Sequence, residues 1–157
     1  MKKLTQLMKN QRGLTLIELL AVVVILGIIA AIAVPSIGGI IDNTKKDAHI
    51  ANAEQMVSSA RLAQASGVNE EDNEGSTTYT LEDLVSGNYL ESPENPGASD
   101  EYGDDTQVVI ERGADGDTTY TVTLTSENGN HITTEDNTAT IEELRNNGRQ
   151  YISVDGE

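Results

Sequence analysis

The chain has 157 residues, enough for one domain with an extension but not for two full domains. It carries 26 Asp and Glu against 10 Lys and Arg, it has no Cys, Trp or Phe, and it has two His. This composition excludes a disulfide scaffold and any Cys-based metal or redox site, and it leaves almost nothing for a His-based catalytic dyad or zinc site. We therefore expect a protein that is not an enzyme and that holds no cofactor or metal ion.

The charge is distributed unevenly along the chain. Four of the ten basic residues lie in residues 1–13, where there is no acid, so residues 14–157 carry six basic and 26 acidic side chains. Such an acidic surface repels phosphate backbones, and we expect no direct binding of nucleic acid. The plain interpretation of the charge is a well-solvated exterior.

The chain divides into four zones. Residues 1–13 are polar and basic, residues 14–34 are apolar with Glu18 as their only charge, residues 35–66 have an amphipathic pattern, and residues 67–157 are acidic and rich in Gly and Thr. As a helix, the apolar zone would be roughly 32 Å long, close to the hydrocarbon thickness of a bilayer. The basic flank predicts that the N-terminus stays in the cytoplasm while the rest lies outside.

The amphipathic zone predicts that the helix continues to about Ser66. Its apolar side chains recur mostly at intervals of three and four residues: Ile37, Ile40, Ile41, Ala48, Ala53, Met56, Val57, Ala60 and Ala63. Pro35 lacks a backbone N–H and crowds the preceding turn, so we expect a kink there, and Gly27 loosens the apolar half. The two zones would form one long helix with a transmembrane half and an amphipathic half.

The last zone predicts a small globular head. Thr80 and Thr140 are each followed three residues later by an acid, a pattern typical of the start of a helix, so we expect short helices over 81–90 and from 141. Stretches rich in β-branched residues predict strands over 107–112, 120–125 and 150–154. So thin a core is marginal alone, and we expect an antiparallel sheet to pack on the apolar stripe of the long helix. The predicted fold is α+β, a ladle with a helical shaft and a small antiparallel-sheet head.

The most informative motif lies at the first boundary. A basic leader ends at Gly13, Glu18 follows Leu14 by four residues, the apolar run is otherwise uninterrupted, and Pro35 stands at its far end. This combination resembles the class III signal of type IV pilins and type II secretion pseudopilins. The family usually has Phe where this chain has Leu14, and many of its Gram-negative pilins close the head with a disulfide that this chain lacks. We therefore expect packing alone to hold the terminal region of the head.

The resemblance implies that a prepilin peptidase cuts between Gly13 and Leu14 and N-methylates Leu14. It also implies that Glu18 neutralises the N-terminal amine of a neighbouring subunit during assembly, and that the helix loosens near Gly27 and Pro35. The expected function is a structural subunit, similar to a major pilin, of a homo-oligomeric helical filament of the type IV pilus type. Its expected partners are its own copies, the peptidase, and the membrane platform and ATPase of the assembly machine. The expected location is a single-pass position in the plasma membrane, then an extracellular filament at the cell surface.

The cost of a charge inside a bilayer supports this role for Glu18. An ionisable side chain at the centre of a membrane span costs about 2.5–3.5 kcal/mol on the insertion scale, and less near an interface. Such a residue usually has a partner. An α-amino group created by cleavage four residues away would supply one from the adjacent chain.

Plainer interpretations of the N-terminal segment stay open. An ordinary secretory signal would place its cleavage site at Ala31-Ile32-Ala33, and in a signal anchor Glu18 would merely reach the interface. The length of the apolar run, Glu18 and the apolar stripe that continues beyond Pro35 disfavour the first. Within the family, the alternative is a competence-type or type II secretion pseudopilin. From a different class, it is a monomeric membrane-anchored binding protein with an extracellular head.

Acidic turns and histidines in the head are weaker candidates for a site. Residues 100–105 and 115–117 offer oxygen ligands for calcium, but neither has the EF-hand spacing, and acidic Gly-rich loops are usually solvated turns. We expect His49 and His131 at the surface. Glu142 and Glu143 are better interpreted as first-turn acids of a helix than as a catalytic pair.

Overall fold

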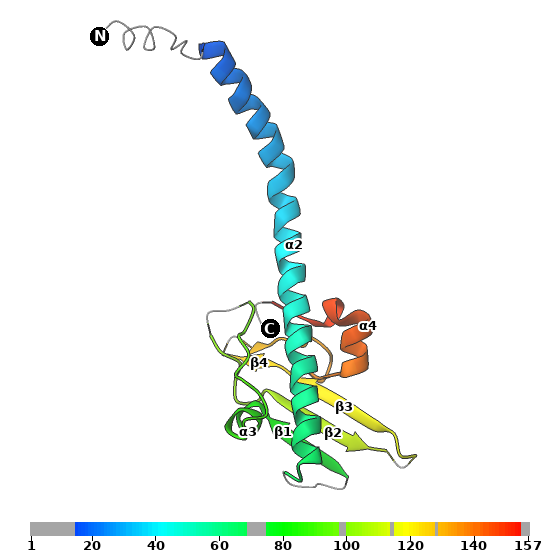
Figure 1. Cartoon of the computed structure of the whole chain (residues 1–157). Coiled ribbons are helices and arrows are strands. Elements are labelled where there is room, and N and C mark those ends of the chain that lie inside the picture. The colour runs from blue at the N-terminus through cyan, green and yellow to red at the C-terminus, as the bar shows by residue number, and fades with distance from the viewer. Residues whose placement is uncertain (1–14, 69–74, 98–99, 114, 128, 155–157) are drawn as a thin grey trace, which may run out of the picture. The chain divides into compact units, whose positions relative to one another are not determined.

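The computed structural model describes residues 15–68, 75–97, 100–113, 115–127 and 129–154 (Figure 1). The chain forms two compact units, Met1–Ile40 and Ile41–Glu157. Its elements follow in the order α2 (Leu16–Ala65), β1 (Ser76–Thr80), α3 (Leu81–Ser86), β2 (Gln107–Arg112), β3 (Thr118–Thr123), β4 (Thr125–Ser126), β5 (Gly129–Asn130), β6 (Ala139–Thr140) and α4 (Ile141–Tyr151). A long helix and a small antiparallel sheet confirm the predicted α+β fold class.

Helix α2 has 50 residues and continues through Gly27 and Pro35. It ends one residue before the predicted stop, where Gly67 takes a left-handed conformation (φ 78°) that favours glycine. The Gly67 N–H then donates to the Gln64 carbonyl at 3.1 Å, and the Val68 N–H donates to the Ala63 carbonyl at 3.2 Å. These two bonds form a Schellman motif, which satisfies the last carbonyls of the helix. The loosening expected at Gly27 and Pro35 stays a prediction.

The main sheet has four antiparallel strands in the order β1-β2-β3-β6. Its register aligns Tyr79, Val108, Val122 and Ala139 in one row across the four strands. Each of these side chains is at most 2% exposed. Because successive side chains alternate between the two faces of a strand, this row defines the face of the sheet that builds the core.

The amphipathic half of α2 supplies one side of that core, as predicted, and the sheet lies beside it in Figure 1. The apolar side chains that α2 buries are Ala53, Met56, Val57, Ala60 and Ala63. Those they join from the rest of the head include Leu84, Leu124, Ile132, Leu144 and Ile152. Three of the five α2 residues are alanines, so the sheet can approach the helix backbone closely.

Both helices of the head start as predicted, with a capping box. The Thr80 N–H donates to Asp83 at 3.1 Å and the Asp83 N–H donates back to Thr80 Oγ1 at 3.1 Å. Thr140 and Glu143 repeat the arrangement, with N–H to carboxylate at 2.9 Å and N–H to hydroxyl at 3.3 Å. Each box satisfies backbone donors that would otherwise lack a partner in the first turn. Helix α3 ends at Ser86, earlier than expected, because Gly87 caps it.

The strand predicted over 150–154 is wrong, because α4 continues to Tyr151 and Ile152 then forms only an isolated bridge with Ile132. The helix is favoured because it packs on α2, burying Ile141, Leu144 and Gly148. At the contact with α2, a Cβ on Gly148 would lie 2.6 Å from Ile50 Cδ1, so glycine allows the close approach.

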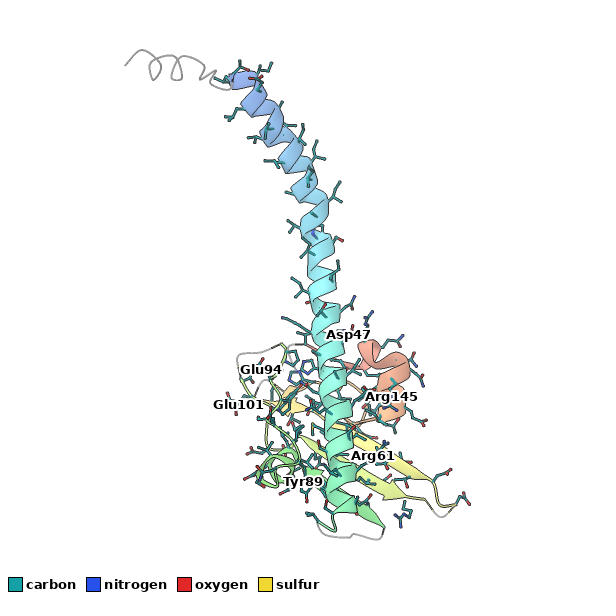
Figure 2. All side chains as sticks on the ribbon, viewed as in Figure 1. Asp47, Arg61, Tyr89, Glu94, Glu101 and Arg145 are labelled. Carbon is teal, nitrogen blue, oxygen red and sulfur yellow. The ribbon has the colours of Figure 1, made fainter. Side chains whose placement is uncertain are left out.

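Exposed ion pairs also join α4 to α2. The Arg145 guanidinium lies 2.7 Å from the Glu54 carboxylate, and Arg149 binds Asp47 with a distance of 2.7 Å from Nε to Oδ1. Figure 2 labels Arg145 on α4 and Asp47 on α2. The hydrogen bond from Arg149 holds the pKa of Asp47 below its ordinary value. Because both pairs face solvent, we expect them to orient α4 more than to stabilise it.

Two other sequence predictions need correction. Strand β3 covers Thr118–Thr123 instead of 120–125, because the ladder stops before the buried Leu124 and β4 then pairs with β5. Strand β1 was not predicted, since its sequence Ser-Thr-Thr-Tyr-Thr is polar. It forms because β2 pairs with it along its whole length. The strand can be polar because Tyr79 is its one fully buried residue.

The expectation that His49 and His131 lie at the surface is also wrong. Both side chains are 0% exposed. His49 lies one helical turn before Ala53, on the stripe of α2 that faces the core. His131 directly follows β5, where its N–H donates to the Leu124 carbonyl at 2.8 Å.

The shared core predicts that the head depends on the amphipathic half of α2. A chain that begins at Asp42 should unfold cooperatively on heating, whereas a chain that begins at Gly67 lacks one side of the core and should show no cooperative transition. Circular dichroism melts of the two chains measure the difference. Equal melting temperatures would show that the head closes its core without the helix. As a matched pair in the longer chain, the buried Met56→Ala should lose about 2–5 kcal/mol and the exposed Leu62→Ala less than about 0.5 kcal/mol.

A second prediction concerns the contact between Gly97 and the end of the chain. A Cβ on Gly97 would lie 2.1 Å from the Val154 carbonyl oxygen, which is backbone and cannot turn aside. Gly97→Ala should therefore lower the free energy of unfolding by about 1–3 kcal/mol in urea denaturation of the full chain in detergent. Gly113→Ala is the matched control, because its Cβ would meet the Asp117 carbonyl at an ordinary 3.5 Å. Equal stability of the two variants would contradict this account.

Candidate assembly site

The first part of α2 carries an uncovered apolar surface. Every large apolar side chain from Leu16 to Ile41 is exposed, and these side chains project from the helix in Figure 2. Because residues such as Val22-Val23-Val24-Ile25-Leu26 follow one another 100° apart, they occupy the whole circumference. Among the described residues, α2 is the helix that is long and apolar enough to cross a membrane. Such a surface requires lipid or other apolar helices around it.

The polar residues at the start of α2 form a third capping box. The backbone N–H and the hydroxyl of Thr15 each donate to Glu18 Oε2 at 2.8 Å, and the Glu18 N–H donates back to Thr15 Oγ1 at 3.3 Å. Thr15 is thus the N-cap residue, and Glu18 occupies the third helical position. The negative charge also lies in the first turn, where the helix dipole favours it.

This box changes the energetics of placing Glu18 beside an apolar run. A carboxylate in a low-dielectric environment is costly unless hydrogen bonds satisfy it. Thr15 supplies two such bonds from within the same turn, so Glu18 has partners before any neighbouring chain arrives. Sequence reasoning missed the role of Thr15, although Thr15-Leu16-Ile17-Glu18 has the same spacing as the box at Thr140.

The other predicted site residues fall in two groups. Gly13 and Leu14 lie outside the described residues, so cleavage and methylation at this junction stay predictions. Gly27 and Pro35 lie within α2, and a Cβ on Gly27 would have no neighbour within 4 Å. The structure therefore brings Glu18 together with Thr15, and it places Gly27 and Pro35 further along the same apolar segment.

A comparison with protein families identifies this segment. Residues 8–34 match the family described as the prokaryotic N-terminal methylation motif. The chain carries the class III signal of type IV pilins and pseudopilins. In general, this signal implies processing by a prepilin peptidase and assembly into pilus-like filaments. Comparison with curated proteins and with solved structures finds no match.

The head lies outside the matched residues, and its acidic turns offer oxygen ligands for calcium. Asp100, Glu101, Asp104, Asp105 and Glu127 line one open hollow of the head. Within the described ranges, however, no three His, Asp or Glu side chains come close enough together to hold a metal ion.

The class III signal predicts that Gly13→Val blocks maturation of the prepilin. A peptidase that cuts at this junction must approach the chain closely, and a branched side chain at Gly13 would obstruct it. The variant should stay in the membrane fraction at full precursor mass, as measured by mass spectrometry. Gly27→Val is the matched control, because it adds the same side chain in open space inside the apolar run and should leave trimming unchanged. Normal trimming of Gly13→Val would show that the cleavage site lies elsewhere.

Proposed function

We propose that this prepilin is the major structural subunit of a type IV pilus-type filament and that it has no enzymatic activity. The observation that carries the proposal is the exposed apolar circumference of α2 from Leu16, headed by the carboxylate of Glu18. An anchor needs only the apolar surface. A filament subunit also needs a polar group that sets how neighbouring helices align.

The proposed path begins in the plasma membrane, with the basic leader in the cytoplasm and the head outside. Moving α2 from lipid into a bundle of α2 helices exchanges one apolar environment for another, so the hydrophobic effect contributes little to this step. The membrane platform and its ATPase would therefore supply the energy to extract the subunit. Contacts between unlike surfaces of successive copies then propagate without closing, which produces a helical filament at the cell surface.

In this proposal Glu18 and the new N-terminus act together. Cleavage between Gly13 and Leu14 would create an α-amino group directly before Thr15, close to the turn that already binds Glu18. Inside the filament the surroundings are apolar, and a carboxylate there needs a charged partner. Pairing with the amine of Leu14 on a neighbour would satisfy both charges and set the axial register between subunits, as single buried polar residues do in coiled coils.

We therefore predict that Glu18→Gln is processed normally but enters filaments poorly. The amide keeps the size of the side chain and loses its charge, and removal of one partner from a buried charge pair costs about 2–5 kcal/mol, so the yield should fall more than tenfold. The yield is measured by comparing sheared surface filaments with the membrane fraction in a strain in which the variant is the sole subunit. Glu18→Asp should also assemble poorly, because its carboxylate is withdrawn by one methylene.

Glu142→Gln is the matched control for this experiment. Glu142 is also a first-turn acid of a helix, but it is exposed in the head, so its neutralisation should leave filament yield unchanged. Wild-type filament yield from Glu18→Gln would contradict the assembly mechanism. The mature N-terminus tests the wider proposal, because methylated Leu14 supports a filament subunit whereas an intact Met1 would indicate a monomeric anchor. Short, unshearable filaments with normal processing would favour the competence-type or type II secretion pseudopilin.

A further inference from the structure

The two histidines of the prepilin lie against each other inside the head. His49 comes from α2 and His131 follows β5, and their ring centroids are 4.4 Å apart with planes inclined by 30°. The Tyr102 ring meets both edge-on, with centroid distances of 5.8 Å to His49 and 5.9 Å to His131. All three side chains are buried.

The hydrogen bonds around His131 indicate which of its ring nitrogens donates and which accepts. Its Nδ1 lies 3.0 Å from the Ser153 carbonyl oxygen, which only accepts, so Nδ1 carries the proton. Its Nε2 lies 3.3 Å from Asn95 Nδ2, which only donates, so Nε2 must accept. The Gly97 N–H lies 3.5 Å from Asn95 Oδ1, which supports this orientation of the amide. A second proton on His131 would therefore face a donor.

The surroundings of His49 are equally unsuited to a charge. Its Nδ1 lies 2.8 Å from the Tyr102 hydroxyl, whose oxygen also accepts from Asn52 Nδ2 at 3.0 Å. The hydroxyl then donates its own proton to Nδ1. Within the described part of the chain, His49 Nε2 is buried without a hydrogen-bond partner. A second proton on His49 would turn Nδ1 into a donor and leave the Tyr102 proton without its acceptor.

Within the described ranges, the titratable groups that face His49 are the Tyr102 phenol and the His131 imidazole, and neither supplies a negative charge. Burial, with a smaller effect from His131, lowers the pKa of His49 to about 4, and burial raises the pKa of Tyr102 to about 12. Among neighbouring charged residues, Glu94 and Glu101 are exposed on the loop that carries Tyr102. On α2 the charges one turn before His49 are cations, Lys45 and Lys46.

The two rings connect chain segments that form almost no strand pairing of their own. Tyr102 and Asn95 belong to residues 91–97 and 100–106, where the structure has only turns and one isolated bridge. Ser153 belongs to residues 152–154, which follow α4. Asn52 of α2 also holds residues 91–97, because its Nδ2 donates to the Glu94 carbonyl at 2.9 Å. The histidines thus lie where the loop, the end of the chain and α2 meet.

We propose that His49, stacked on His131, is the acid-sensitive part of a latch. With His49 neutral, the stacked rings hold residues 91–97, 100–106 and 152–154 against α2, and protonation of His49 releases these segments while the sheet stays folded. The latch concerns the head alone, so it does not depend on the filament role proposed above.

The direction of the pH dependence follows from His49. In an open head this ring would have the ordinary histidine pKa near 6.5, whereas in the closed head its pKa is about 4. The latch is therefore fully stable above about pH 6.5 and weakens as the pH falls toward 4. For His49 alone, the ratio of closed to open heads should fall about 20-fold between pH 7 and pH 5.

Amide hydrogen exchange on the full chain in detergent micelles tests the latch. The probes are the N–H groups of Gly103, bonded to the Thr125 carbonyl, and of Ser153, bonded to the His131 carbonyl, with amides of β2 and β3 as the internal reference. After correction for intrinsic exchange rates, the opening equilibrium at both probes should rise about 20-fold from pH 7 to pH 5. No rise, or an equal rise in β2 and β3, would overturn the proposal.

The double variant His49→Asn with His131→Asn is the matched control. Each Asn side chain keeps a polar group near the position of Nδ1 but does not titrate. Because the chain has no further His and no Cys, the variant has no side chain with an ordinary pKa between 5 and 7. Its opening should change less than about threefold over this range. A rise equal to that of the wild-type chain would assign the effect to carboxylates and overturn the latch.

The wild-type rings provide a measurement that does not rely on the variant folding. Their ¹⁵N and ¹³C resonances report the protonation of His49 and His131 directly. At pH 6 an ordinary histidine is mostly charged, whereas the latched His49 ring should remain neutral. A charged His49 ring at pH 6 with full protection at Gly103 and Ser153 would show that the closed head accommodates the charge, and would overturn the proposal.

Discussion

The head depends on one stripe of small side chains along the second half of α2. Ala53, Met56, Val57, Ala60 and Ala63 are the buried apolar residues of this stripe, and they share one core with the buried row of the sheet. Without this stripe, the buried row across the sheet would face water, because α3 and α4 are short. The burial of His49 also follows from its position on this stripe.

A threonine followed three residues later by an acid forms a capping box at the start of α2, α3 and α4. The role of this box depends on what surrounds it. At Thr80 and Thr140 the box opens a short helix at the surface of the head. At Thr15 the same chemistry stands at the start of an apolar run, so the carboxylate of Glu18 is hydrogen-bonded next to exposed apolar side chains. A local helix signal thereby becomes part of the site to which we assign subunit alignment.

The head has no disulfide, and buried polar contacts hold its terminal segment instead. Ser153 donates to the His131 carbonyl and accepts from the His131 ring, and Gly97 lies directly against Val154. A disulfide responds to reductants, whereas the buried His49 imidazole responds to protons, because burial disfavours its charged form. A head held in this way would be sensitive to pH instead of to reductants, and no added domain is needed for that sensitivity.

The sequence by itself determined the features that depend on neighbouring residues. The three-to-four spacing of apolar residues predicted α2 almost to its last residue, the boxes at Thr80 and Thr140 predicted two helix starts, and the β-branched run of residues 107–112 predicted β2. The signal around Gly13 and Glu18 predicted the match of residues 8–34 to the prokaryotic N-terminal methylation motif, since its chemistry lies within one short segment. Each of these signals is local, so no distant part of the chain was needed to interpret it.

Only the tertiary structure decided which polar residues became core. The polar strand β1 forms because β2 lies beside it, and α4 extends to Tyr151 because Gly148 fits against Ile50. His49 and His131 are 82 positions apart in the sequence, and no local pattern indicates that their rings stack. Burial of a polar side chain depends on the partners that fold around it, and those partners are set by contacts between distant segments.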